Sequence, residues 1–170
     1  MEQVILVDEQ DNEVGVMEKM QAHVEGRLHR AVSVFLFNAK NEMLLQQRAF
    51  SKYHSGGLWS NTCCSHPAPG EKVADAAVRR LGEEMGMNCP LQISFTFIYK
   101  AHLDHGLTEF EYDHVFTGIT DQQPIPNPDE VTAWKYMSRE RLLADMLLNP
   151  QDYTEWFKIC LQDHSQAIFS

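Results

Sequence analysis

Two runs rich in β-branched, aromatic and aliphatic residues predict a pair of strands in the first third of the chain. The first run extends from Arg30 to Phe37 and the second from Met43 to Arg48. Between them, residues 38–42 form a polar segment typical of a turn. Strands joined by so short a polar connection usually pair as a hairpin. We therefore expect a β-hairpin over residues 30–48.

The pattern changes to a helical spacing over Val73–Met85. Four apolar residues recur at that spacing: Ala74, Val78, Leu81 and Met85. Such a stripe is expected to face the core, and Gly86 follows it as a residue that ends helices. A neighbouring stripe carries Arg80 and Glu84 one turn apart, at the edge of the predicted buried face. That position suits side chains that line a cleft.

The rest of the chain contains further strand, turn and helix signals. Two strand-like runs, a Pro-rich turn and two amphipathic helices follow in order: Ile93–Lys100, Thr108–Ile119, Gln122–Pro128, Arg139–Leu148 and Tyr153–Leu161. Ser138 is placed to cap the first of these helices. Strands outnumber helices and do not alternate with them strictly, which favours an α+β fold with a mixed sheet sandwiched between helices. We expect residues 1–170 to form one domain.

Composition restricts the function classes. The chain has 170 residues, of which 44% are hydrophobic, and a formal net charge of −10. That charge disfavours nucleic acids and anionic membranes as partners, and an anionic substrate needs a local basic pocket. The first residues lack the pattern of a signal peptide, and no apolar run is long enough to span a bilayer. We expect a cytoplasmic protein, a monomer or weak dimer, whose 4 cysteines are reduced.

The segment that carries the strongest chemical signal is Asn61-Thr62-Cys63-Cys64-Ser65-His66-Pro67. It places a thiol two residues before an imidazole, and the predicted helix with Arg80 and Glu84 follows. This Cys-x-His-Pro core resembles the active-site segment of the type 1 isopentenyl-diphosphate isomerases, a branch of the Nudix superfamily. The resemblance extends over nearly the whole chain and includes Glu109-Phe110-Glu111.

The predicted helix and its approach also resemble the Nudix signature, with two departures. Ser65 stands where the signature begins with Gly, and Arg80 replaces the first of its metal-binding glutamates. A cation at that position argues against a Nudix hydrolase of nucleoside or other diphosphates, which is the first alternative function. The second alternative is a non-catalytic metal-binding or diphosphate-sensing module, in which Cys64→Ala would change no activity.

The resemblance implies a metal centre built from histidines and glutamates. Its ligands are three imidazoles and two carboxylates: His23, His29, His66, Glu109 and Glu111. Two of these, Glu109 and Glu111, lie two residues apart in a predicted strand, so their side chains point to the same face of the sheet. The donors suit Zn²⁺, Mn²⁺ or Mg²⁺. We expect His23 and His29 to lie outside regular structure, and we take His54, His102, His105, His114 and His164 as non-ligands.

The implied reaction interconverts isopentenyl and dimethylallyl diphosphate, and it requires an acid and a base on either side of an alkene. We expect Glu111, with Tyr99 as a proton relay, to protonate the alkene and Cys64, activated as a thiolate by nearby positive charge, to accept the other proton. The reverse assignment stays open because the reaction is reversible. Cys63 is the alternative thiol.

The resemblance also implies the groups that hold the substrate. Trp156 faces the developing carbocation, whereas Trp59 and Trp134 are expected to pack in the core. Glu84 binds a Mg²⁺ ion that bridges the phosphate oxygens. Four basic residues surround the diphosphate: Lys19, Arg48, Lys52 and Arg80.

Overall fold

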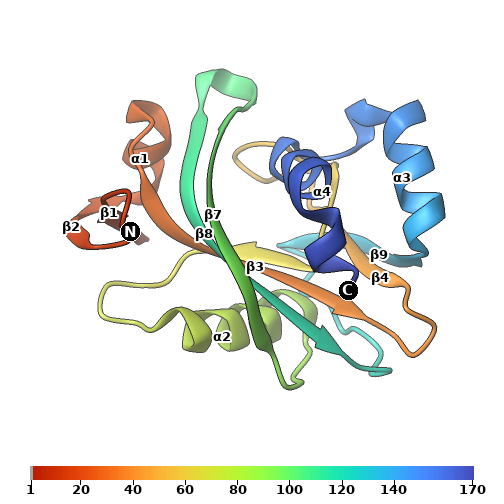
Figure 1. Ribbon diagram of the computed structural model, residues 1–170. Helices are drawn as coiled ribbons and strands as arrows, with labels where there is room; N and C mark the ends of the chain where they lie inside the picture. The colour runs from red at the N-terminus through yellow and green to blue at the C-terminus, as the bar shows by residue number, and fades with distance from the viewer. Residues whose placement is uncertain (1) are drawn as a thin grey trace.

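A mixed nine-stranded sheet forms the centre of the computed structural model, which describes residues 2–170 (Figure 1). Its middle strand, β3 (His29–Phe37), pairs in parallel with β8 (Thr108–Ile119) and antiparallel with the short β6 (Cys63–Ser65). On the far side of β8 lies β7 (Gln92–His102), which is antiparallel to it. The remaining strands extend the sheet beyond β3: β1 (Gln3–Val7), β2 (Glu13–Glu18), β4 (Met43–Arg48), β5 (Trp59–Ser60) and β9 (Val131–Met137).

Helices cover both faces of this sheet. Figure 1 shows α2 (Val73–Met85) below it and α4 (Glu155–Ile168) above it, with α3 (Arg139–Leu148) beside α4 and α1 (Lys19–Glu25) next to β1 and β2. Short 3₁₀ turns lie at Asp104–Gly106 and Pro150–Asp152. The expected α+β architecture, a mixed sheet between helices, is confirmed. None of the helices within residues 2–170 is long and apolar enough to cross a membrane.

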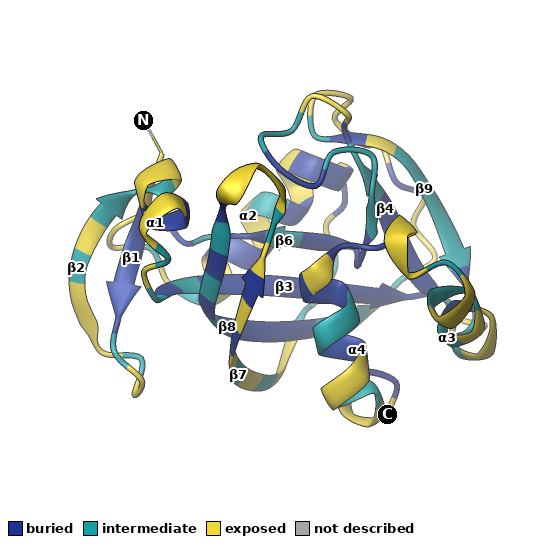
Figure 2. Cartoon of the chain, turned by 90° about the horizontal axis from the view of Figure 1, so that it is seen from above, coloured by how far each residue is buried: buried dark blue, intermediate teal, exposed yellow. Residues whose placement is uncertain are grey.

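Side chains of β3 point alternately to the two faces of the sheet, and apolar residues on both faces account for the helices that cover them. Val32, Val34 and Leu36 join the core beneath α2, whereas Phe35 and Phe37 join the core beneath α4. Every one of these side chains is buried, and Figure 2 shows most of the strand in the colour of buried residues. A strand covered on both faces reads as an unbroken apolar run, which is the pattern seen at residues 31–37.

The prediction of which face of α2 is buried is wrong, because the helix is rotated about its axis relative to that prediction. Leu81 and Met85 are buried as expected, but Val78 is 46% exposed and Ala74 is also exposed. The buried face instead combines Leu81 and Met85 with Ala76, Ala77 and Glu84. Alanines on that face let the helix approach β3 and β6 closely, and the rotation carries Glu84 into the interior. The helix ends at Gly86 as predicted, with φ 62°, where a Cβ would meet the Ile125 carbonyl oxygen at 2.3 Å.

The sequence predicted the ends of some other helices and strands correctly and those of others incorrectly. The bounds of α3 and β8 are confirmed, and Ser138 accepts a hydrogen bond from the Arg141 amide as the cap. The last helix begins at Glu155 rather than Tyr153, because Tyr153 and Thr154 are extended. The expectation that His23 and His29 lie outside regular structure is wrong: His23 is in α1 and His29 opens β3.

Candidate active site

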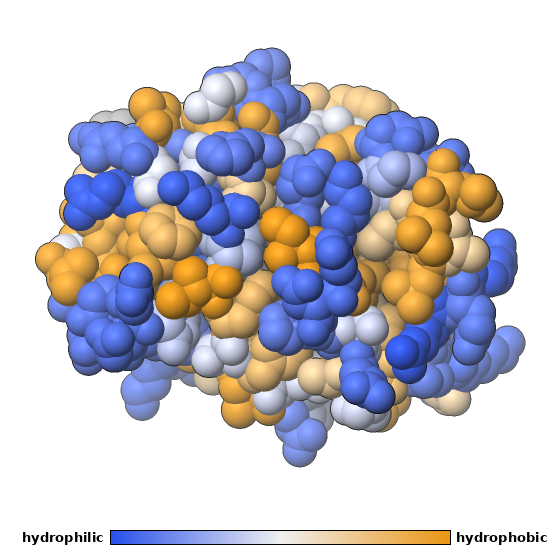
Figure 3. All heavy atoms as spheres, turned by 45° about the horizontal axis from the view of Figure 1, so that its top comes forward, coloured by the Kyte–Doolittle hydropathy of each residue, from blue (hydrophilic) through white to orange (hydrophobic). Residues whose placement is uncertain are grey.

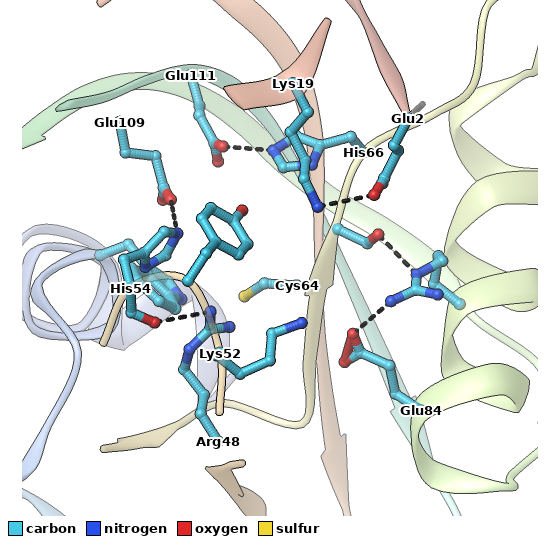
Figure 4. A pocket seen from close by; sticks show the side chains of 14 residues that line it. Glu2, Lys19, Arg48, Lys52, His54, Cys64, His66, Glu84, Glu109 and Glu111 are labelled. Carbon is cyan, nitrogen blue, oxygen red and sulfur yellow. Dashed lines mark hydrogen bonds and ion pairs between the residues drawn. The ribbon is translucent and has the colours of Figure 1, made fainter. Parts of the chain in front are cut away.

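A pocket opens among β4, β6, β8, α2 and the N-terminal segment, and it collects residues from distant parts of the chain. Hydrophilic side chains cover most of the face seen in Figure 3, interrupted by smaller apolar areas. All the predicted substrate-binding residues line the pocket: Lys19, Arg48, Lys52, Arg80 and Trp156. Most of the predicted catalytic and metal-binding groups line it too: Cys64, His66, Glu84, Glu109 and Glu111 (Figure 4).

Two imidazoles meet on one carboxylate oxygen at the floor of the pocket. Glu111 Oε2 lies 3.0 Å from His29 Nε2 and 2.8 Å from His66 Nε2. His29 Nδ1 lies 2.8 Å from the Arg27 carbonyl oxygen, so this nitrogen must donate and the lone pair of a neutral ring is on Nε2. Burial by itself raises the pKa of Glu111, but His66 and His29 outweigh that effect and hold it well below its ordinary value. A neutral His29 ring therefore directs its lone pair at the Glu111 carboxylate, an arrangement that fits a proton or a metal ion between the two groups.

His23 repeats this geometry beside the second glutamate. Its Nδ1 lies 2.8 Å from the Lys19 carbonyl oxygen, and α1 therefore fixes the tautomer. Its Nε2 is buried and has no hydrogen-bond partner within residues 2–170. That nitrogen lies 3.8 Å from Glu109 Oε2. A buried, unpartnered lone pair facing a carboxylate fits a divalent metal ion.

Tyr99 joins the two glutamates. The register of β7 and β8 places Tyr99 opposite Glu111, and its hydroxyl contacts Glu109 and lies 2.7 Å from Glu111 Oε1. The alternation of β8 puts Glu109 and Glu111 on one face, as predicted, and both are buried. One hydroxyl proton serves two carboxylates, so Tyr99 donates to one of them at a time.

His54 lies in the cluster, although it is expected from the sequence to be a non-ligand. It is 2% exposed, and its Nε2 lies 3.8 Å from Glu109 Oε2 without a hydrogen-bond partner in the described chain. Burial, together with Arg48, lowers its pKa to about 2, so the ring is neutral. Its residue type was the only sign in the sequence that His54 could belong to the site, since the loop that contains it has no periodic pattern of apolar residues. The other histidines excluded from the ligand set, His102, His105, His114 and His164, belong to neither group of candidate ligands in residues 2–170.

The alternation of β6 separates the two adjacent thiols. Cys64 lines the pocket, whereas Cys63 is buried in the core beneath α2. Cys64 Sγ donates to Asn61 Oδ1 at 3.0 Å and lies 3.6 Å from Ser33 Oγ. Burial raises the pKa of the Cys64 thiol far above its ordinary value, and Asp113 adds to the effect. Both effects oppose the thiolate expected from the sequence.

The basic residues around the opening are held in defined positions. Lys19 Nζ pairs with Glu2 at 2.7 Å, and Lys52 Nζ pairs with Glu130 at 2.7 Å. Arg48 donates to the His54 carbonyl oxygen at 3.1 Å, and its guanidinium lies 5.1 Å from the centre of the Trp156 ring. These contacts fix three cationic side chains at one opening of an acidic protein.

Arg80 and Glu84 form a separate pair on α2. Arg80 donates to Glu84 Oε2 and to Ser65 Oγ, each at 2.8 Å. Gln46 donates to Glu84 Oε1 at 3.0 Å. Glu84 thus lies apart from the groups of candidate ligands formed by the histidines. The pocket has an imidazole-rich floor and a rim that combines cations with the carboxylates of Glu2 and Glu84.

Comparisons with known proteins agree with this geometry. The NUDIX domain family profile matches residues 27–157. An isopentenyl-diphosphate Delta-isomerase of Pectobacterium atrosepticum is 53% identical over 171 residues, covering 99% of this chain and 96% of that protein. Isopentenyl-diphosphate Delta-isomerase 1 of Aromatoleum aromaticum is 54% identical over 160 residues, covering 94% of this chain and 90% of that protein.

Solved structures share the fold at much lower identity. The structure of DR0079 from Deinococcus radiodurans superimposes with a TM-score of 0.73 at 23% identity, covering 86% of this chain and 90% of that chain. The Nudix hydrolase RenU of M. smegmatis gives a TM-score of 0.61 at 17% identity, covering 95% of this chain and 92% of that chain. At these identities the likeness establishes the fold alone.

Proposed function

The chain belongs to the NUDIX family and, within it, to the isopentenyl-diphosphate Delta-isomerases, and we propose that it isomerises this substrate in the pocket around Cys64 and Glu111. The observation that carries the proposal is the meeting of a thiol, a tyrosine-linked carboxylate and four cations in one pocket. The first two supply proton transfer, and the cations supply diphosphate binding. That the protein is cytoplasmic, and that it is a monomer or a weak dimer, remain predictions from the sequence.

The diphosphate binds at the basic rim. Lys19, Arg48, Lys52 and Arg80 line the same opening, and a chain of net charge −10 attracts an anion only through such a local cluster. Arg80 is the strongest candidate for direct contact, because a guanidinium offers several donors to phosphate oxygens. Glu84 holds a Mg²⁺ ion that arrives with the diphosphate and offsets its charge.

A second, resident divalent ion is held by His23, His29, His66, Glu109 and Glu111. The unpartnered Nε2 of His23 and the two imidazoles directed at Glu111 support this assignment. When bound, the ion orients these carboxylates and lowers their affinity for protons. The donor set suits Zn²⁺ and Mn²⁺ better than Mg²⁺, because imidazole is a poor ligand for Mg²⁺.

Proton transfer uses Cys64 and the pair formed by Tyr99 and Glu111. Cys64 Sγ donates to Asn61 Oδ1, burial favours its protonated form, and His66 and His29 favour the ionised form of Glu111. We therefore assign to Cys64 the proton that is given to the alkene carbon of isopentenyl diphosphate. Glu111, with Tyr99, then accepts the proton released two carbons away. This order reverses the assignment expected from the sequence, and the backward reaction exchanges the two roles.

Trp156 forms the apolar wall of the pocket. Its side chain is 4% exposed and already lies against the Arg48 guanidinium, 5.1 Å from the ring centre. An aromatic face stabilises a neighbouring cation by about 0.5–2 kcal/mol without reacting with it. That property suits a site where positive charge develops on carbon.

A proton NMR time course in deuterated buffer tests this function. The metal-loaded protein with isopentenyl diphosphate and Mg²⁺ is expected to produce dimethylallyl methyl signals and to incorporate deuterium. The variants Cys64→Ala and Glu111→Gln should abolish both, and Cys63→Ala should preserve both. Release of inorganic phosphate or diphosphate without isomerisation would instead support the Nudix hydrolase, which the relatives and Arg80 disfavour.

A further inference from the structure

We propose that His54 is a fourth imidazole ligand of the resident metal ion, so that the centre contains four histidines and two glutamates. The inference rests on the metal centre proposed above and enlarges it by one residue. It is based on the position of the buried His54 side chain, to which the proposed mechanism assigns no other role.

The distances around Glu109 are those of groups that share an ion. Glu109 Oε2 lies 3.8 Å from His54 Nε2 and 3.8 Å from His23 Nε2 (Figure 4 shows the first contact). Each gap is too long for a hydrogen bond. Donor atoms that each lie about 2.1 Å from one ion are separated by roughly 3–4 Å. A divalent ion between the carboxylate and the two imidazoles therefore accounts for both gaps.

The His54 imidazole has a free nitrogen directed into this space. The residue is 2% exposed, and Nε2 has no hydrogen-bond partner within residues 2–170. An unpartnered buried nitrogen costs free energy, which a metal bond would recover. Nδ1 lies 3.0 Å from Ser55 Oγ and can donate to it, which leaves the lone pair on Nε2.

The backbone around His54 is anchored as expected for a ligand. Arg48 donates to the His54 carbonyl oxygen at 3.1 Å, and the Ser55 amide donates to Asp104 Oδ1 at 3.1 Å. Ser55 adopts a left-handed conformation with φ 55°, which non-glycine residues avoid unless the surroundings hold them there. The strained turn, tied to β4 and to the β7–β8 connection, directs the ring inward.

The candidate ligands divide into two groups that share a member. One group contains His23, His29, His66 and Glu111, and the other contains His23, His54 and Glu109. Because His23 Nδ1 is engaged by the Lys19 carbonyl, its single remaining lone pair can serve only one ion. An ion bound to His23 is therefore shared by both groups, whose other donor atoms each lie within 4.8 Å of the His23 donor nitrogen. With His54 the protein offers six donors, which is enough to fill an octahedral shell and leave the ion no open position for substrate.

Co²⁺ provides the test, because its visible bands intensify when six-coordination falls to five. In the protein loaded with Co²⁺, His54→Ala is expected to intensify these bands and to weaken Co²⁺ affinity about 10-fold or more, measured by competition with a chelator. His102→Ala is the matched control, since it removes an exposed imidazole outside the cluster and should change neither quantity. Thermal unfolding of the metal-free variants shows whether both are folded.

The outcomes separate this inference from the proposal beneath it. If the wild-type protein binds no Co²⁺, or if His29→Ala leaves binding unchanged, the whole metal centre is wrong. If wild type binds Co²⁺ and His54→Ala keeps the same spectrum, His54 is not a ligand, even where affinity falls. Should His54→Ala fail to fold, X-ray absorption of the wild-type protein loaded with Zn²⁺ decides: four imidazoles support the inference, and three overturn it.

Discussion

Cys63 and Cys64 are neighbours in sequence, yet strand alternation gives them opposite environments. Cys64 faces the pocket, close to Asn61 and Ser33, while Cys63 lies in the core beneath α2. We predict that Cys64 is a protonated thiol in the free protein, because burial disfavours the thiolate and the nearby carboxylates disfavour it further. An infrared difference spectrum between wild type and Cys64→Ser should contain an S–H stretching band. The three remaining thiols cancel in this difference, and a missing band would mean a thiolate.

The adjacent arginines of α2 provide a matched pair. Arg80 lines the pocket and contacts Glu84 and Ser65, whereas Arg79 pairs on the surface with Glu71 and Glu83. Loss of one charge-assisted contact costs about 1.5–3 kcal/mol. Arg80→Gln should therefore raise KM for isopentenyl diphosphate by roughly 10-fold to 100-fold. Arg79→Gln should leave KM within about twofold, because exposed ion pairs contribute about 0–1 kcal/mol and this one is remote from the substrate. Equal effects of the two substitutions would remove Arg80 from the binding site.

At the scale of helices and strands, the spacing of apolar residues located α2 and β8 but did not predict which face of α2 is buried. The stripe through Ala74 and Val78 and the stripe through Ala77 and Glu84 are both consistent with the spacing of apolar residues. Hydrophobicity favours the first, yet small residues allow the close approach to the sheet that the second provides. Glu84 lies on the buried face and also lines the pocket. A rule that maximises apolar burial therefore misplaces a helix that carries site residues.

The orientation of α2 has a measurable consequence. Leu81 is 1% exposed and Val78 is 46% exposed. Leu81→Ala should lower the free energy of unfolding by about 2–5 kcal/mol through lost packing and a cavity. Val78→Ala should change it by no more than about 0.5 kcal/mol, since the side chain lies largely in solvent. Urea denaturation of the two variants measures the difference, and comparable losses would restore the stripe expected from the sequence.

At the scale of the whole molecule, the site is an assembly of separate segments. The motif at residues 61–67 and the pair Glu109 and Glu111 were identifiable from residue type and spacing. Their approach depends on the parallel pairing of β3 with β8, which sets His29 opposite Glu111 and has no local sequence signal. The same holds for His54, whose place depends on contacts with Arg48 and Asp104. Local patterns thus indicated the candidate residues, and long-range pairing brings them together.

Because the proposed ligands come from α1, β3, β8 and the segment just after β6, the proposed resident ion should act on the stability of the whole fold. An ion that binds only the folded chain stabilises it by about 2.7 kcal/mol at a concentration 100 times its Kd. For a domain of this size that free energy raises Tm by about 5–11 °C. We predict a shift of this size when Zn²⁺ or Mn²⁺ is added to chelator-treated protein in calorimetry. The double variant with His29→Ala and His66→Ala should lose the shift, because Glu111 then has no imidazole partner. An unchanged Tm for wild type would mean that the buried imidazoles and carboxylates are held together by protons alone.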